Sequence, residues 1–469
     1  MKRLSIITSA LLLAACASDD RTLPPIGQIL LHIDTDAPLP APPGEALGET
    51  DAPALFDRVR VEVFKPGEKV ACAGCTHEFD IDRKLVAEGR ASVGITPPPH
   101  TEGFLARVRI YRAAFVAASE PRPDATLDST FVLPPVDAEG KVDVTATLRV
   151  DDVAKPKGSF DQPLAVQGGP PTPIGLWPSA KRVPCTGSPK PGEVCVPGGA
   201  FWMGNPLMRF FHETGDELVM RLVVVSPFYL DSTEVTVAAF RPSGLAADKD
   251  PMRYDVNDGQ PGPPLHCTYT DAPGNDETLP VNCISWSKAH EYCNAQGGDL
   301  PTEAEHQYAA SGLEGRLYPW GQDDPACADS VYARSRFTTE PEFICPGAWV
   351  MPAASGLRDR VVLPGGVIHD LGGNLAEHAL DLWNLQTEKC WGKGVLVDPL
   401  CADPSTDPNA DGQHTVVGGS FVGSAGETTA AYRKPAFSFG RAKANGPAGG
   451  RYAAQVTSVG FRCSRPATQ

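Results

Sequence analysis

The sequence predicts an α+β chain in which an all-β sandwich precedes a second domain of low regular secondary structure. Three observations lead to this prediction: alternating apolar segments between residues 27 and 152, a proline-rich stretch at 153–184, and two capped helical patterns among Gly- and Pro-rich connections beyond residue 185. A length of 469 residues suits two such domains together with targeting and linker segments.

The first residues, MKRLSIITSALLLAAC, combine two basic residues, an apolar run and small residues before Cys16. The stretch from Leu13 to Cys16 resembles a bacterial lipobox, which implies that residues 1–15 are a signal peptide and that the Cys16 thiol carries a diacylglyceryl group. Ala17, in place of Asp, does not suggest retention at the inner membrane, so we expect an outer-membrane anchor. A plain secretory signal or a short membrane helix is the alternative, although the apolar run falls short of the ~20 residues that a spanning helix needs.

Residues 16–26 are polar and are expected to form a tether. The next part of the chain, 27–152, contains segments of near-strict alternation separated by Pro, Gly and Asp, and no helical period. These segments are GQILLHIDTD, DRVRVEVFKP, FLARVRIYRAAF, STFVLPPV and KVDVTATLRVDD. Short alternating strands at this spacing predict an antiparallel β-sandwich, which we interpret as a spacer or adhesion-like module.

The stretch 153–184 has seven prolines and no periodicity, so it is predicted to be a linker to a domain at 185–469. The clearest helix of that domain is SKAHEYCNAQG, which Ser287 can cap and two glycines can end. A second helix follows Thr302, where Thr302 and Glu305 match a capping box. The apolar residues predicted to form the buried face of this helix are Ala304, Tyr308 and Ala309.

The chain has thirteen cysteines, and one lipid-bearing cysteine leaves an even number for disulfides in an oxidising compartment. Two short loops are plausible pairs, Cys72 with Cys75 and Cys185 with Cys195. The segment CAGCTH does not match a haem attachment, because its His does not directly follow the second Cys, and it lacks a second ligand pair for zinc. A local disulfide is therefore favoured there.

Lys and Arg total 41 against 57 Asp and Glu, which gives a net charge of -16. This charge disfavours nucleic acid or an anionic membrane surface as a general partner. A small cationic ligand or a divalent metal suits it better.

Eight short segments between residues 195 and 465 occur in an order that resembles the formylglycine-generating enzyme, or sulfatase-modifying factor, family. They are VPGGAFWMGN, VVVSPFYLDSTEVTVAAF, PVNCISWSKAHEYC, LPTEAEHQYAA, YPWG, LGGNLAEH, VVGGSF and VGFRC. The resemblance implies a compact domain with little regular secondary structure, related to the C-type lectin fold.

Catalytic members of the family resemble one another in a segment GGS-aromatic-x-Cys, followed five residues later by a second Cys beside Tyr-Arg. Their two thiolates hold copper(I), which activates oxygen to convert a substrate cysteine to formylglycine. In this chain the two cysteine positions fall at Gly423 and at or beside Thr428, while Tyr432 and Arg433 match the Tyr-Arg pair. Neither Gly nor Thr can replace a soft thiolate ligand, so we expect no copper. The four residues are instead a candidate ligand groove.

The resemblance also implies a structural calcium site in the stretch around Gly-Asn-x-x-Glu. Its ligands here would be the side chain of Asp370, the carbonyl groups of Gly373 and Leu375, and the side chain of Glu377. Mixed carboxylate and backbone oxygens are what calcium takes. The alternative is that the two acidic residues only accept backbone hydrogen bonds.

These features predict a lipid-anchored envelope protein whose second domain is non-catalytic and binds a protein, peptide or glycan, or acts as a scaffold. The alternative is a divergent oxidase of the same family that acts on a protein or peptide substrate with a different metal. It requires at least two of His306, His369, His378 and Asp381 to converge in one pocket, since neutral imidazole binds iron or copper.

Overall fold

The computed structural model describes residues 27–46, 48, 50–205, 219–245, 267–334, 344–347, 349–405, 413–436 and 457–467. Within these ranges no helix has the length and apolar character needed to cross a membrane. The predicted signal peptide and the whole of the predicted tether, which includes Cys16, lie outside the described residues.

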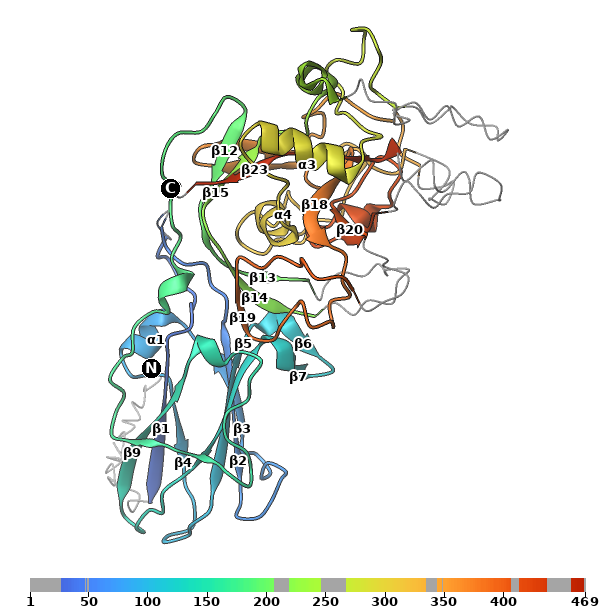
Figure 1. The fold of residues 1–469 in the computed structure, drawn as a ribbon. Helices are drawn as coiled ribbons and strands as arrows, with labels where there is room; N and C mark the ends of the chain where they lie inside the picture. The colour runs from blue at the N-terminus through green and yellow to red at the C-terminus, as the bar shows by residue number, and fades with distance from the viewer. Residues whose placement is uncertain are drawn as a thin grey trace, which may run out of the picture.

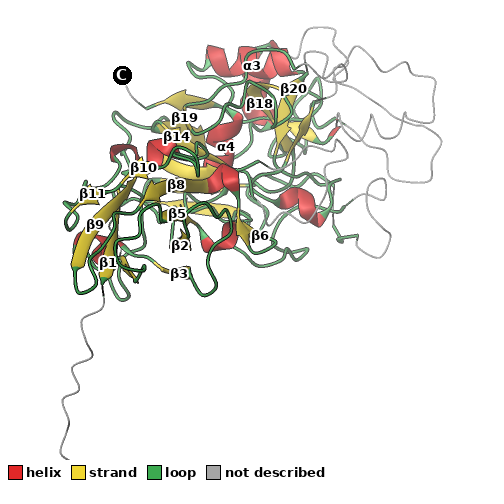
Figure 2. Cartoon of the chain, turned by 90° about the horizontal axis from the view of Figure 1, so that it is seen from below, coloured by secondary structure: helices red, strands yellow, loops and turns green. Residues whose placement is uncertain are grey.

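Two sheets make up most of the N-terminal region, in the orders β11-β9-β1-β4 and β10-β8-β5-β2-β3 (Figure 1). Their strands are β1 (Gln28–Thr35), β2 (Arg58–Phe64), β3 (Thr76–Asp80), β4 (Ser92–Ile95), β5 (Leu105–Tyr111), β8 (Thr126–Val132), β9 (Lys141–Leu148), β10 (Leu164–Ala165) and β11 (Gln167–Gly168). A small hairpin of β6 (Val116–Ala117) and β7 (Glu120–Pro121) and the helix α1 (Arg83–Ala87) complete the region. Figure 2 shows β8, β5, β2 and β3 side by side.

The five alternating segments contain β1, β2, β5, β9 and most of β8, so the strand pattern predicted for them is confirmed. Strand β1 runs antiparallel to β4 but parallel to β9 over its whole length, so the prediction of an antiparallel arrangement is wrong for this pair. The helix α1 was not predicted, because it is only five residues long, too short to show a period. Its N-cap Asp82 accepts a hydrogen bond from the Leu85 N–H at 2.8 Å.

The stretch 153–184, predicted as a linker, contributes short strands to both sheets. Strand β10 pairs with β8, and β11 pairs with β9. Trp177 is buried in the same apolar cluster as the sheets, and its N–H donates to the Asp36 carbonyl at 2.8 Å. The stretch 153–184 is therefore packed against the N-terminal sheets over part of its length.

The C-terminal region is built from several small sheets and a few short helices. Its strands are β12 (Glu193–Val196), β13 (Gly199–Met203), β14 (Arg221–Val225), β15 (Phe228–Asp231), β16 (Arg360–Leu363), β17 (Gly366–His369), β18 (Ala376–Leu382), β19 (Val395–Val397), β20 (His414–Val417), β21 (Arg433–Pro435), β22 (Val459–Gly460) and β23 (Ser464–Pro466). The sheet orders are β12-β15-β23, β13-β14-β19, β16-β17 and β21-β20-β18-β22. The chain is thus rich in sheet and has few helices.

The helices of this region are α2 (Val237–Phe240), α3 (Trp286–Ala295) and α4 (Glu303–Ala310). The prediction that Ser287 caps α3 is wrong: Ser285 has the extended backbone of an N-cap and accepts from the Lys288 N–H, while Ser287 lies in the first turn. The capping box at α4 is confirmed, since Thr302 accepts from the Glu305 N–H and Glu305 from the Thr302 N–H. The predicted buried face of α4, Ala304, Tyr308 and Ala309, is also confirmed.

Trp202 on β13 joins the two regions. Its ring centroid lies 5.5 Å from that of Phe56 and 5.7 Å from that of Phe115, both in the N-terminal region. Its indole N–H donates to the Leu55 carbonyl at 2.8 Å. Because Trp202 and Leu222 belong to the same buried apolar cluster as the N-terminal sheets, the two regions share a continuous core.

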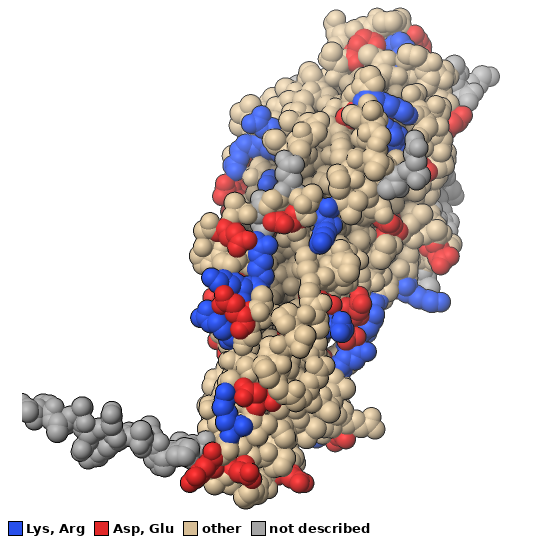
Figure 3. All heavy atoms as spheres, turned by 90° about the vertical axis from the view of Figure 1, so that its left-hand side faces the viewer, with Lys and Arg blue, Asp and Glu red and all other residues tan. Residues whose placement is uncertain are grey.

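Six disulfides link the described cysteines. They are Cys72–Cys75, Cys185–Cys195, Cys267–Cys283, Cys293–Cys463, Cys327–Cys345 and Cys390–Cys401. The two predicted local pairs, Cys72–Cys75 and Cys185–Cys195, are therefore confirmed. On the molecular face shown in Figure 3, basic and acidic side chains form small mixed groups along the length of the molecule.

Candidate functional site

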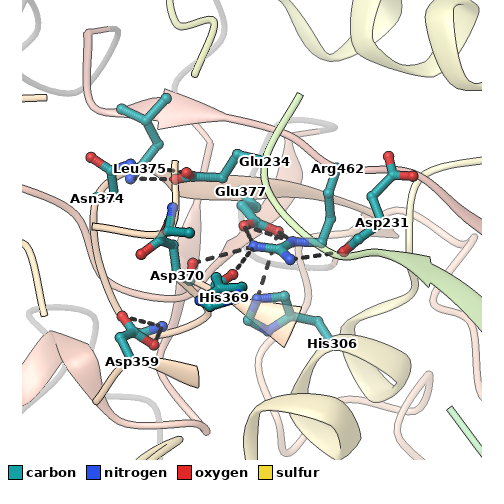
Figure 4. A network of polar contacts seen from close by, with 12 residues as sticks. Asp231, Glu234, His306, Asp359, His369, Asp370, Asn374, Leu375, Glu377 and Arg462 are labelled. Carbon is teal, nitrogen blue, oxygen red and sulfur yellow. Dashed lines mark hydrogen bonds and ion pairs between the residues drawn. The ribbon is translucent and has the colours of Figure 1, made fainter. Parts of the chain in front are cut away.

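A fully buried arginine lies at the centre of the C-terminal region (Figure 4). Arg462, between β22 and β23, is 0% exposed, and its Nε and Nη2 donate to the carboxylate of Glu377 on β18 at 2.7–2.9 Å. Its remaining donors meet the carbonyl groups of Asp231 at 3.0 Å, His369 at 2.8 Å and Asp370 at 3.3 Å. Three strand ends and the stretch after β22 therefore converge on one guanidinium group.

Further buried carboxylates surround this centre. Glu234 accepts from the side-chain amide of Asn374 at 2.9 Å and from the Leu375 N–H at 2.8 Å. Asp359 accepts from the Gly372 N–H with both oxygens, at 3.0 and 3.1 Å. These hydrogen bonds fold the loop before β18 around the acidic groups. We call Arg462 and the acidic residues Asp231, Glu234, Asp359, Asp370 and Glu377 the Arg462 network.

The network contains more acidic groups than basic ones. Burial raises the pKa of Glu234 well above its ordinary value, and the neighbouring Asp370 and Glu377 carboxyl groups raise it further. Burial likewise raises the pKa of Asp370 to about 7 and that of Asp359 to about 6. Burial alone would lower the pKa of Arg462, but Glu377 raises it, so the guanidinium stays charged. The single cation does not balance the acidic groups around it.

His306 on α4 lies beside the network but is not hydrogen-bonded to it. Its Nε2 is 3.8 Å from a Glu377 oxygen, and neither ring nitrogen has a hydrogen-bond partner among the described residues. Burial and the nearby Arg462 lower the pKa of His306 to about 3. The imidazole is therefore neutral at physiological pH.

The predicted calcium ligands lie at the network. Asp370 uses one carboxylate oxygen to accept from the Ala354 N–H, and its other oxygen is buried without a hydrogen-bond partner in the described part of the chain. Glu377, by contrast, is bound to Arg462 through both oxygens. Of the two predicted carboxylate ligands, only Asp370 therefore has an oxygen that no described residue engages.

The two positions assigned to the family's cysteines lie in the turn after β20. A Cβ atom added at Gly423 would be 2.8 Å from Oε2 of Glu427, so this carboxylate occupies the adjacent space. The other Glu427 oxygen accepts from the Ser424 N–H at 3.1 Å, and Lys434 Nζ is 3.7 Å from Oε2. Thr428 is fully buried, and its hydroxyl donates to a backbone carbonyl.

The other two candidate groove residues differ in burial. Arg433 is buried, pairs with Glu303 at 2.6 Å, and has its guanidinium 4.1 Å from the ring centroid of Trp383. Tyr432 is partly exposed. Three of the four candidate groove residues are thus packed inside the domain.

Of the residues in the alternative oxidase prediction, His306 and His369 lie at the Arg462 network, whereas His378 and Asp381 have other partners. The imidazole Nε2 of His378 lies 3.0 Å from the Ile284 carbonyl. The Asp381 carboxylate accepts from the Glu303 and Cys401 N–H groups. Across the described residues, no group of three or more His, Cys, Asp or Glu side chains is placed to hold a metal ion.

Sequence reasoning missed the role of Arg462, Glu234 and Asp359. The segment VGFRC pointed to the family, but its arginine was given no partner. A charged residue between apolar neighbours was the available signal, since such a residue is rarely buried without a counter-charge.

The C-terminal region is thus a sheet-rich domain with short strands around a buried polar centre. The profile of the sulfatase-modifying factor enzyme 1-like domain matches residues 180–467. The chain therefore belongs to this family, as the sequence resemblance predicted.

Two curated relatives illustrate the range of the family. A formylglycine-generating enzyme of Streptomyces coelicolor is 32% identical over 161 residues, which cover 28% of this chain and 51% of the relative. The inactive C-alpha-formylglycine-generating enzyme 2 of Mus musculus is 31% identical over 160 residues, again 28% of this chain and 51% of the relative. The chain thus matches about half the length of each.

The solved structure of PvdO from Pseudomonas aeruginosa aligns with a TM-score of 0.37 and 17% identity over 60% of this chain and 100% of that chain.

Proposed function

We propose that this protein is a lipid-anchored envelope protein whose sulfatase-modifying-factor-like domain is non-catalytic and serves in binding or scaffolding. The pairing of the cysteines carries the proposal. Of the thirteen cysteines, twelve are joined in six disulfides, which leaves only the predicted lipid-bearing Cys16. A copper(I) centre needs free thiolates, and a disulfide sulfur is not one.

The packing near Gly423 supports the same proposal. The Glu427 carboxylate fills the space beside the first cysteine position, and Lys434 lies close enough to balance its charge. A hard carboxylate next to a lysine is a poor setting for a soft, singly charged copper ion.

The proposed location follows from the N-terminal lipobox and from the disulfides. Six disulfides suit an oxidising compartment such as the periplasm or the cell surface. We place the anchor in the outer membrane. In this proposal the two N-terminal sheets are a β-sandwich that holds the lectin-related C-terminal domain away from the lipid.

A calcium ion would have a structural role at the Arg462 network. It would be held by the unpartnered oxygen of Asp370, the carbonyl groups of Gly373 and Leu375, and Glu377 in common with Arg462. The excess of buried carboxylates supports this assignment, because a divalent cation would offset their mutual repulsion. Thermal melting in calcium and in a chelator tests it. We expect a higher Tm with calcium, and Asp370→Asn should remove the difference.

An oxidase assay tests the non-catalytic assignment. The purified protein, loaded with copper(I) under reducing conditions that leave its disulfides intact, is mixed with a cysteine-containing peptide while oxygen consumption is followed. We expect no peptide-dependent consumption and no formylglycine by mass spectrometry. The Streptomyces coelicolor relative, assayed alongside, is the positive control. Turnover at a comparable rate would overturn the proposal.

A further inference from the structure

A cavity of about 420 Å³ lies beside the Arg462 network, and Gly423 and its neighbours are not among its lining residues. It is lined by the loop before β12, the segment that follows β15, the end of α3 and the start of β23. The lining residues that matter most are Lys190, Glu193, Asp231, Thr233, Tyr292 and Arg465. Its volume is in the range of small-molecule sites.

The basic side chains of this cavity already have partners. Arg465 donates to both oxygens of Glu193 at 2.7 Å, and its guanidinium lies 4.2 Å from the ring centroid of Tyr229. Lys190 Nζ donates to the Gln296 carbonyl. Glu193 therefore balances the charge of Arg465, whereas the Lys190 ammonium group is hydrogen-bonded to a neutral carbonyl and keeps its positive charge at the cavity.

Asp231 is an acidic group of the cavity wall whose carboxylate makes no ion pair within the described residues. Its backbone carbonyl accepts from Arg462, but Figure 4 shows its carboxylate turned away from the guanidinium. One carboxylate oxygen accepts from the Cys463 N–H at 2.9 Å, and no hydrogen bond to the other oxygen is present in the described part of the chain. Burial raises the pKa of Asp231 to about 6, although the Cys463 N–H and the charge of Arg462 act in the opposite direction.

The surroundings of Asp231 favour a positive ligand. Behind it lie the excess carboxyl groups of the Arg462 network, of which Glu377 acts on Asp231 directly. Tyr292 adds an aromatic ring to the wall, and rings of this kind attract cations. Ser232 and Thr233 add hydroxyl groups, which both donate and accept hydrogen bonds.

We propose that this cavity binds a small polyhydroxylated amine, of the chemical class of an unacetylated amino sugar, with its ammonium group on Asp231. The carboxylate supplies the charge, and the hydroxyl groups and the tyrosine ring match a sugar rather than a purely aliphatic amine. This proposal rests on the binding role given above and names its ligand class.

Titration calorimetry with glucosamine tests the proposal on the whole mature protein. N-acetylglucosamine lacks the positive charge and should bind at least about tenfold more weakly, as expected when a charge-assisted hydrogen bond is lost. Asp231→Asn keeps an oxygen for the Cys463 N–H and should weaken glucosamine binding by a similar factor. The matched control, Asp80→Asn, alters an exposed acid of the N-terminal region and should bind as the unmodified protein does.

A second variant keeps the test decisive if Asp231→Asn does not fold. Thr233→Tyr fills the cavity from a partly exposed position and should abolish glucosamine binding. Equal affinity for glucosamine and N-acetylglucosamine, or no binding of either, would overturn the proposal. Tighter binding of Nα-acetyl-lysine methylamide than of glucosamine would overturn the sugar assignment. None of these results depends on the oxidase assay, so failure here is separable from failure of the non-catalytic assignment.

Discussion

The N-terminal and C-terminal regions are held together in different ways. In the N-terminal region one apolar cluster extends over both sheets, and the single disulfide there spans a separation of three residues. In the C-terminal region the apolar residues fall into several separate clusters, and the other five disulfides are found there. That region also contains the fully buried ion pair of Arg462 and Glu377.

This difference follows from strand length. Strands of seven or eight residues place enough apolar side chains on one face to build a continuous core. Most strands of the C-terminal region have two to five residues and bury too little to do so. We infer that cross-links and buried polar contacts replace part of the missing apolar burial.

The largest expected effect is the loss of a long-range disulfide. Cys293 and Cys463 are separated by 170 residues, whereas Cys72 and Cys75 are separated by three. The chain-entropy model gives a loss of about 5 kcal/mol for replacing the first pair by alanine and about 2 kcal/mol for the second. Urea unfolding of the two double variants measures both. Equal losses would contradict the difference between the regions.

Removal of the buried guanidinium should come next. Arg462→Met leaves the Glu377 carboxylate unpaired and buried, at a cost of about 3–5 kcal/mol in unfolding free energy. Arg58→Met removes a pair with the exposed Asp80 and should cost at most about 1 kcal/mol. The double variant Arg462→Met/Glu377→Met should be less destabilised than Arg462→Met alone, because no unpaired charge remains. A double variant as unstable as the single one would show that packing, not charge, dominates.

A smaller effect is expected from the close approach at Gly423. Gly423→Ala should cost about 1–3 kcal/mol, since its Cβ would meet the Glu427 side chain at 2.8 Å. Gly168→Ala in the N-terminal region meets nothing within 4 Å and should be near neutral. Adding Glu427→Ala should recover part of the Gly423→Ala loss, which a double-mutant cycle detects. If the stability losses of Gly423→Ala and Glu427→Ala simply add, the strain does not come from the contact between these two residues.

The smallest effect concerns pH. Burial raises the pKa of Glu305 from 4.5 to about 7, so its stabilising contribution is complete below its unfolded pKa and is lost as the pH rises through 7. Glu305→Gln keeps the capping box and does not titrate. It should therefore gain on the order of 1 kcal/mol over the unmodified protein above about pH 8, and the gain should vanish in acid.

The opposite sign is expected in the N-terminal region. The Arg109 guanidinium lowers the pKa of Glu120, so Glu120→Gln should lose stability at high pH, with the difference fading on acidification. Thermal melts of both variants across the pH range give the two signs. If both variants gained stability at high pH, or both lost it, the difference between the two regions would be contradicted.

Local pattern explains which parts could be predicted. The alternating segments around β1, β2 and β5 and the capping box at Thr302 depend on neighbours within a few residues, so the sequence predicts them well. The α3 cap was misplaced because Ser285 and Ser287 are equally suitable by residue type.

The Arg462 network was not predictable in the same way. Arg462 meets the Asp231 carbonyl across a separation of 231 residues, and no local pattern records that contact. Likewise, the glycine at position 423 was visible in the sequence, but the side chain that fills the space beside it, Glu427, was not.

The packing of Trp202 between the two regions fixes the C-terminal region relative to the N-terminal sheets. The C-terminal end of β1 lies near Trp202, because β1 leads to Pro38, whose carbonyl accepts from the Leu55 N–H, and the Leu55 carbonyl accepts from Trp202. The chain therefore enters β1 at the end far from Trp202. Eight residues of strand span roughly 26 Å. If the lipid is attached before Gly27, as proposed, the N-terminal sheets would form a rigid spacer. The shared core would leave no hinge at the boundary between the two regions. Any rotation of the N-terminal sheets would therefore carry the cavity beside Asp231 with it, because the two regions share one core.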